Sequence, residues 1–170
     1  MKERRKIRNP FKADEYMCFG CSPGNHIGLK LTFEEDDEKL YATWQPDPVF
    51  QGYLNVLHGG IIATLLDEAG AWCVYVKAGT SGVTASLTVR YLKPVYISKG
   101  PVSVEAMLVA RGEKNALLSA SLFDGEGKLC AEADLDYFIY PEQIARRRFY
   151  YPGTEAFRFQ SGQQEPQSGQ

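Results

Sequence analysis

Residues 56–72 combine a histidine, three glycines and two adjacent carboxylates in a segment that is otherwise almost entirely apolar. His58-Gly59-Gly60 stands near the start of the segment and Asp67-Glu68 lies in its second half. Glycines at the start of a helix leave N–H groups exposed at the positive end of the helix dipole, where they stabilise a polarised carbonyl or a developing oxyanion. A carboxylate is suited to act as a general base, so this pattern is typical of chemistry at a carbonyl group.

Asp67 is the more informative carboxylate because it lies on a stripe of small residues. At helical spacing the stripe comprises Gly60, Ala63, Thr64, Asp67, Gly70 and Ala71. Glu68 points about 100° away, and we expect it to be a bystander. A simpler interpretation stays open: Asp67 only accepts hydrogen bonds from a neighbouring strand, and His58 only fixes the loop before the helix.

Gly59 and Asp67 cannot both serve one carbonyl group within a single chain. They are eight positions apart, which separates them by about 12 Å along a helix that rises about 1.5 Å per residue. A two-fold dimer with antiparallel helices would place Gly59 of one subunit beside Asp67 of the other and make two equivalent sites. We therefore expect a homodimer, extended to a dimer of dimers, although the sequence does not decide between dimer and tetramer.

Two kinds of hydrophobic period define the elements around this segment. Residues 29–33 and 40–44 alternate with a period of two, which predicts a hairpin. Prolines and a glycine predict an irregular loop over residues 45–57. The apolar run that follows predicts a helix over residues 60–77. Four further alternating runs predict strands over residues 83–91, 102–110, 116–122 and 129–139. Because short turns join these runs, we expect them to be antiparallel neighbours in sequence order.

A helix that is apolar on most faces must be enclosed, so we expect an α+β fold with a curved antiparallel sheet around one long central helix. We place this domain at residues 16–140. A basic arm over residues 1–15 precedes it and is expected to be solvated. A C-terminal extension over residues 141–170 follows, and we expect its glutamine- and glycine-rich end to be disordered.

Cys18 and Cys21 form a CxxC pair in a turn-rich stretch, with His26 five residues further on. A structural zinc site normally needs four ligands, and Cys73 and Cys130 lie in apolar patterns rather than in a second ligand pair. We therefore interpret the CxxC stretch as a tightly packed turn, and we expect neither a metal nor a redox function.

The composition is that of a soluble globular protein, with 44% hydrophobic and 24% charged residues in 170. A formal net charge of -2 does not favour binding to nucleic acid or to an anionic membrane. Thr64, Asp67 and Glu68 interrupt the longest apolar run, so we do not expect it to span a membrane. The sparse cysteines and the absence of a secretion signal in the sequence favour a cytoplasmic protein.

The HGG motif at residues 58–60, Asp67, and the run at residues 82–94 together resemble the hotdog-fold acyl-CoA thioesterases of the phenylacetate-degradation (PaaI-like) type. The resemblance extends over residues 16–140 and includes the FQG triplet at residues 50–52 and the CFGCSP leader. It implies a hotdog fold and hydrolysis of an acyl-CoA to free acid and CoA. It implies no cofactor.

The resemblance also implies a role for each catalytic residue. The N–H of Gly59 would bind the thioester carbonyl oxygen, and His58 would hold that loop. Asp67 of the other subunit would act either as the general base for water or as the nucleophile that forms a mixed anhydride. Thr84 would supply the hydroxyl that helps to place the water.

Further residues are expected to contact the substrate: Gln51, Asn55, Gly60, Ser86 and Arg90. Many family members carry Asn or Gln six residues before the histidine, where this chain has Gly52, so Gln51 or Asn55 would take that supporting role. The nucleotide phosphates need surface cations, for which Arg90, Lys93 and Arg111 are candidates, although each is also a common type of solvated strand-end charge.

Two other functions are open. A non-catalytic acyl-CoA sensor could use the same scaffold, since a fold does not determine a function. A hotdog dehydratase ranks last, because His26 and His58 do not lie in a hydratase loop motif. The acyl group also stays open, because the following aromatic residues could line an acyl pocket or belong to the core: Trp44, Phe50, Tyr53, Trp72 and Tyr75.

Overall fold

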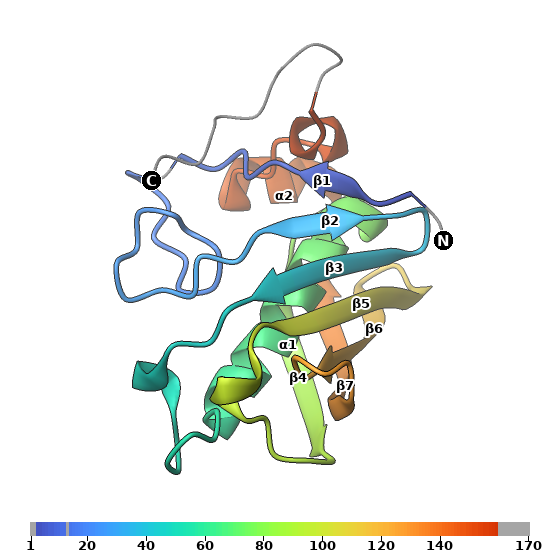
Figure 1. The fold of residues 1–170 in the computed structure, drawn as a ribbon. Coiled ribbons are helices and arrows are strands. Elements are labelled where there is room, and N and C mark those ends of the chain that lie inside the picture. The colour runs from blue at the N-terminus through green and yellow to red at the C-terminus, as the bar shows by residue number, and fades with distance from the viewer. Residues whose placement is uncertain (1–2, 13, 160–170) are drawn as a thin grey trace.

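A curled antiparallel sheet wraps around one long helix in the computed structural model of the chain, which describes residues 3–12 and 14–159 (Figure 1). The strands are β1 (Arg5–Ile7), β2 (Phe33–Glu35), β3 (Lys39–Trp44), β4 (Gly82–Tyr91), β5 (Val102–Arg111), β6 (Asn115–Phe123) and β7 (Leu129–Ile139). They form one seven-stranded sheet in the order β1-β2-β3-β5-β6-β7-β4, and every neighbouring pair is antiparallel. The expected curved sheet around a central helix is confirmed.

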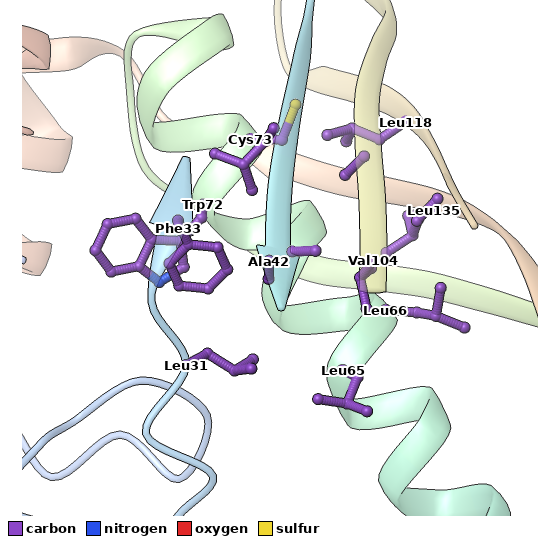
Figure 2. Close-up of a cluster of buried hydrophobic side chains, with 14 of the residues drawn as sticks. Leu31, Phe33, Ala42, Leu65, Leu66, Trp72, Cys73, Val104, Leu118 and Leu135 are labelled. Atoms are coloured by element: carbon purple, nitrogen blue, oxygen red, sulfur yellow. The ribbon is translucent and has the colours of Figure 1, made fainter. Parts of the chain in front are cut away.

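The central helix α1 (Gly59–Cys73) begins at the glycine pair and continues as a π-helical turn (Val74–Ala78) that ends at Gly79. Gly79 has a φ of +67°, a left-handed conformation that is open to glycine and that commonly ends a helix. The residues of α1 that are buried are Ile62, Leu65, Leu66, Ala69, Gly70, Trp72 and Cys73. In Figure 2, side chains of α1 lie among sheet side chains such as Phe33, Ala42, Val104, Leu118 and Leu135.

The α1 segment is long and apolar enough to cross a membrane by length and composition, with a mean hydropathy of 1.2 over Gly59–Ala78. Our expectation that its polar residues exclude such a span is therefore wrong by that measure. In the folded chain, however, half of the tested window is buried inside the molecule. The sheet supplies the apolar surroundings of the helix, as it does for the core helix of a globular domain.

The position of β4 differs from the order predicted for the four later strands. β4 pairs with β7 at one edge of the sheet, and β5 pairs with β3 instead of β4. The reason is the connection over residues 92–101, which is anchored to the loop before α1: the N–H of Leu57 donates to the carbonyl of Val95 at 2.9 Å. This connection carries the chain past the start of α1, so the two strands do not form a hairpin.

The N-terminal arm is part of the fold where we expected a solvated tail. Arg5–Ile7 pairs with β2, Ile7 is buried, and the N–H of Arg8 donates to the carbonyl of Phe157 at 3.0 Å. The edge of β2 offers unpaired backbone groups, and pairing with β1 satisfies them. The predicted hairpin also starts later than expected, because the ladder of β2 begins only at Phe33.

The C-terminal extension packs on the same core. It contains α2 (Glu142–Phe149) and a 3-10 turn (Thr154–Phe157), and Ala145, Tyr151 and Phe157 are buried. The Tyr151 hydroxyl donates to the carbonyl of Tyr75 at 2.9 Å, which ties the extension to the end of the central helix. The predicted disorder of the final residues concerns residues 160–170, which lie outside the described part of the chain.

Candidate active site

The start of α1 presents a free backbone donor. His58 is the N-cap residue, and its Nδ1 accepts a hydrogen bond from the N–H of Gly60 at 2.9 Å. The Tyr91 hydroxyl donates to the carbonyl of Gly59 at 2.8 Å and fixes the same turn from β4. Within the described residues, the N–H of Gly59 has no hydrogen-bond partner. This N–H therefore remains available to an acceptor at the positive end of the helix.

A pocket of about 610 Å³ opens at this helix start. Its lining residues are Gly52, Tyr53, Val56, Leu57, His58, Gly59, Ile62, Tyr91, Leu92, Lys93, Pro94 and Val95. Ligand pockets in proteins commonly have volumes of about 300–1,000 Å³, so the cavity is large enough for a substantial part of a small molecule. Because Gly59 and Lys93 both line it, the pocket offers a backbone hydrogen-bond donor and a positive charge together.

The carboxylate of Asp67 is held by two hydroxyl groups from neighbouring strands. Thr84 Oγ1 donates to Oδ1 at 2.9 Å, and the Tyr137 hydroxyl donates to the same oxygen at 2.6 Å. Thr84 and Tyr137 are direct cross-strand partners in the β4–β7 ladder, which explains why both reach one atom. Among the described residues, no donor is bonded to Oδ2. One oxygen of Asp67 is thus fixed by two donors, and the other has no donor within the described part of the chain.

Gly70 brings α1 close to β7, the strand that carries Tyr137. A Cβ at this glycine would lie 2.8 Å from a methyl carbon of Leu135 and 3.3 Å from the ring of Tyr137. Any larger residue would push the helix away from the strand. At this position the small-residue stripe therefore serves a contact within the chain, and that contact sets the distance between Asp67 and Tyr137.

Burial raises the pKa of the Tyr137 phenol well above its ordinary value, and the nearby charge of Asp67 raises it further. The phenol accordingly stays protonated at neutral pH and keeps its role as a donor. A neutral donor against a carboxylate orients Asp67 without adding a second charge to the site.

Within one chain, the two halves of the predicted site are separate. Gly59 and His58 line the pocket, whereas Asp67, Thr84 and Tyr137 do not. This agrees with the separation of about 12 Å that the helical rise gives between Gly59 and Asp67. Their approach across a dimer remains a prediction.

Gln51 and Asn55 shape the loop before the helix. Gln51 Oε1 accepts from the N–H of Asn55 at 3.0 Å, and the Asn55 side chain exchanges two hydrogen bonds with Ser98, each of 2.9 Å. Asn55 adopts a φ of +62°, a left-handed conformation that Asn tolerates better than most residues. Both side chains support the pocket wall from behind, and their contact with a substrate stays a prediction.

Ser86 and Arg90 lie on the face of β4 opposite to Thr84, because the strand has a register shift between Thr84 and Ser86. Arg90 forms ion pairs there with Asp134 at 2.6 Å and Glu132 at 3.7 Å. These two residues therefore do not meet Asp67 within one chain.

The other two candidate cations lie at opposite ends of the helix. Lys93 lines the pocket, whereas Arg111 Nε donates to the carbonyl of Ala78 at 3.1 Å, at the far end of the helical segment. Lys93 is thus the candidate phosphate ligand that the pocket itself contains.

Sequence reasoning missed Tyr91 and Tyr137 as site residues. Both occupy inward positions of the alternating strands, but only the β4–β7 register reveals what they face. The five aromatic residues that could line a pocket or belong to the core divide between the two: Trp44 and Trp72 are buried, and Tyr53 is the one of the five that lines the described pocket.

Residues 54–131 match the family model of the thioesterase superfamily. The chain is similar to a provisionally assigned esterase of Saccharolobus solfataricus, with 34% identity over 52% of this chain and 58% of that protein. It is also 34% identical to an uncharacterised protein of Schizosaccharomyces pombe over 79% of this chain and 81% of the relative. Acyl-coenzyme A thioesterase 13 of Mus musculus is 28% identical over 56% of this chain and 69% of its own length. The chain thus spans little more than half of the archaeal relative.

Solved structures confirm the hotdog fold. A mutant thioesterase of Pseudomonas aeruginosa has 25% identity and a TM-score of 0.62, over 71% of this chain and 89% of that chain. A hypothetical thioesterase of Streptococcus pneumoniae, solved with coenzyme A, has 21% identity and a TM-score of 0.60 over 66% and 90%. The PaaI protein of the Escherichia coli phenylacetic acid degradation operon has 18% identity and a TM-score of 0.60 over 67% and 82%.

Proposed function

Because the chain belongs to the thioesterase superfamily and has its hotdog fold, we propose that it hydrolyses an acyl-CoA thioester to the free acid and CoA. The observation that carries this proposal is that α1 places two different chemical groups at two different positions along its length. The helix start offers an unpaired N–H beside a pocket, and its middle offers a carboxylate with one oxygen fixed and one free. Acyl-CoA as the substrate is supported by the mouse thioesterase relative and by the neighbour that binds coenzyme A.

In this proposal, the thioester carbonyl oxygen accepts a hydrogen bond from the N–H of Gly59, which stabilises the negative charge that develops on that oxygen. His58 keeps the N–H in place by capping the adjacent Gly60. The helix dipole adds to the stabilisation because its positive end points at the carbonyl. The acyl-CoA thus binds with its reactive carbon at the mouth of the pocket.

Asp67 of a second copy then acts on that carbon in one of two ways. As a general base, it takes a proton from water while the water oxygen attacks the carbonyl carbon and the CoA thiolate leaves. As a nucleophile, Oδ2 attacks the carbon, CoA leaves, and water hydrolyses the mixed anhydride. The hydrogen bonds from Thr84 and Tyr137 are compatible with both routes, because they hold Oδ1 and leave Oδ2 to react.

A second copy is required because the pocket and Asp67 lie apart in one chain. The surface around β4 supports such a contact: β4 is an edge strand, and its Val83 and Tyr91 are 43% and 53% exposed. The neighbouring side of α1 is half-buried and small at Ala63 and Ala71. We propose that two copies meet there with their helices antiparallel, and that two such dimers associate.

Substrate contacts follow from the same arrangement. Lys93 lines the pocket, where it would attract the nucleotide phosphates. Gly60 does not line the pocket but follows Gly59, which does, so any contact of Gly60 with the substrate would be at the helix start. Ser86 and Arg90 would reach CoA only over the outer face of β4, and Arg90 would first have to release Asp134 and Glu132. Lys93 is therefore the stronger candidate for the phosphate contact.

The decisive experiment is a thiol-release assay with acyl-CoA substrates from acetyl to palmitoyl and with phenylacetyl-CoA. We expect the wild-type chain to release CoA and Asp67→Asn to be slower by about 100-fold or more, since a base or nucleophile is lost. The alternative function, a non-catalytic acyl-CoA sensor, predicts binding of acyl-CoA by the wild type with no thiol release. Unchanged hydrolysis by Asp67→Asn would contradict the proposed mechanism.

A further inference from the structure

Two cysteines and one carboxylate converge beside α1, away from the pocket. Cys18, Cys21 and Glu68 each offer a ligand atom, and these atoms all lie within 4.8 Å of one another. Cys18 Sγ lies 3.4 Å from Oε1 and 3.5 Å from Oε2 of Glu68. Glu68, which we expect to be a bystander to the carbonyl chemistry, makes its contacts here and not at that site. His26, the ligand that the sequence offered as the third, is exposed and does not belong to the cluster.

The separation between Cys18 and Glu68 matches one edge of a zinc tetrahedron. With Zn–S near 2.3 Å and Zn–O near 2.0 Å, a sulfur and an oxygen ligand lie about 3.5 Å apart across the tetrahedral angle. The two distances between Cys18 and Glu68 agree with that edge. The Cys21 sulfur lies within 4.8 Å of both other ligand atoms and would supply a third corner.

The turn around the cysteines is arranged to receive the carboxylate. Backbone N–H groups of residues 29–31 donate to the carbonyls of Phe19 and Gly20 at 2.7 and 2.9 Å and hold the turn in place. A Cβ at Gly20 would overlap the carboxylate of Glu68, so a larger residue at this position would displace that carboxylate. Trp72 Nε1 donates to Oε1 at 3.1 Å and orients the carboxylate, as an outer partner of a metal ligand commonly does.

The cluster concentrates acidic groups without a positive partner. The side chains around the Glu68 carboxylate, those of Cys18, Cys21 and Trp72, carry no positive charge. Within the described residues Glu68 makes no ion pair. A divalent cation would supply the missing positive charge.

We propose that Cys18, Cys21 and Glu68 bind one Zn²⁺ through two thiolates and one carboxylate, with water in the fourth position. The metal would join the N-terminal CxxC turn to α1 across fifty residues of sequence and so stabilise the folded state. This site is independent of the proposed hydrolysis, because Glu68 and Asp67 lie on different faces of α1.

The test uses the purified full-length chain, loaded with Zn²⁺ or Co²⁺ and separated from free metal. We expect about one Zn²⁺ per chain by mass spectrometry of the metal, thiolate-to-cobalt charge-transfer absorption with Co²⁺, and a lower melting temperature after chelation. Cys18→Ser and Cys21→Ser should abolish the cobalt absorption. Glu68→Gln keeps the size of the side chain and should weaken Zn²⁺ binding by more than about tenfold, the lower bound for the loss of a mere outer partner.

Cys130→Ser is the matched control, because Cys130 is also buried and free but lies outside the cluster. It should retain the full metal content, and circular dichroism should show that each variant is folded. Three results would overturn the proposal: wild-type protein that holds no more Zn²⁺ than Cys18→Ser, Glu68→Gln with wild-type affinity, or a Cys18–Cys21 disulfide in freshly purified protein by thiol titration. If the serine variants do not fold, the Zn²⁺ content of the wild type and the Zn²⁺ affinity of Glu68→Gln still test the proposal.

Discussion

Tyr137 and Asp67 are connected through a single phenol hydrogen that has two acceptors. The phenol oxygen lies 2.6 Å from Oδ1 and 2.7 Å from the main-chain oxygen of Asp67. The position of the carboxylate is thereby fixed relative to the backbone of α1, in addition to being limited by the side-chain rotamer of Asp67. Since Tyr137 is the ladder partner of Thr84, the register of two strands determines where the reactive oxygen of Asp67 points.

Tyr137→Phe should therefore impair catalysis while preserving the packing of the ring. We expect hydrolysis to fall by about 10- to 100-fold, because the loss of a hydrogen bond to a charged group costs about 1.5–3 kcal/mol. Thr84→Val is the matched variant, since it removes the other donor to the same oxygen. A thiol-release assay of the single variants and the double variant measures their coupling. Full activity of both single variants would show that Oδ1 needs no positioning.

Gly59→Pro removes the proposed carbonyl-binding N–H with little disturbance of the helix. Proline is favoured at the first helical position, and His58 already has φ -63° and ψ 134°, the conformation that a residue before proline prefers. We expect a near-wild-type melting temperature and a loss of turnover of about 100-fold or more, as for other oxyanion donors. Gly59→Ala, which keeps the N–H, is the control and should retain most activity. Equal loss in both variants would point to crowding against Tyr91 instead of the missing donor.

Glu35→Gln should destabilise the chain without changing its chemistry. Glu35 and Lys77 form a 2.6 Å ion pair in which their side chains are only 4% and 12% exposed. Removing the negative charge leaves Lys77 uncompensated, which costs about 3 kcal/mol. Chemical denaturation of the variant should show this loss, and hydrolysis at low temperature should stay unchanged. Glu142→Gln breaks the exposed pair with Arg146 and should have little effect.

The residues that sequence reasoning singled out were those with a chemical reason to be unusual. Asp67 in an apolar helix needs a partner, and Thr84, which the family resemblance implies for the same site, donates a hydrogen bond to it. The simpler interpretation of Asp67, a carboxylate satisfied by neighbouring strands, also holds for Oδ1. Tyr137 could not be found in this way, because an inward tyrosine on an alternating strand is indistinguishable from a core residue until the register is known.

The errors have a common physical cause, which is long-range pairing. β4 was expected beside β5, but the ten residues between the strands are anchored to the loop before α1 and carry the chain to another edge. The contact between Glu68 and the CxxC turn is likewise hidden in the sequence, because Cys18 and Cys21 are fifty and forty-seven positions away. Local periodicity predicts which side of an element is buried, and it does not predict which distant segment covers that side.

His58→Asn and His58→Ala separate the capping role of His58 from any other role. Asparagine is a good N-cap residue and should keep the bond to the N–H of Gly60. Alanine cannot, and the loss of an N-cap costs about 1 kcal/mol. We expect His58→Ala to lower both the melting temperature and turnover, and His58→Asn to restore most of both. A failure of asparagine to restore turnover, with stability recovered, would show that the imidazole contacts the substrate.

Mixing two inactive variants tests whether the active site is shared between subunits. Asp67→Asn keeps the helix start but loses the carboxylate, and Gly59→Pro keeps the carboxylate but loses the N–H. In a mixed dimer one site receives both intact groups and the other receives neither. Random exchange makes about half of the dimers mixed, so about one quarter of all sites should become active. Refolding the two variants together and measuring thiol release gives this fraction, whereas a site built within one chain would leave the mixture as inactive as its components.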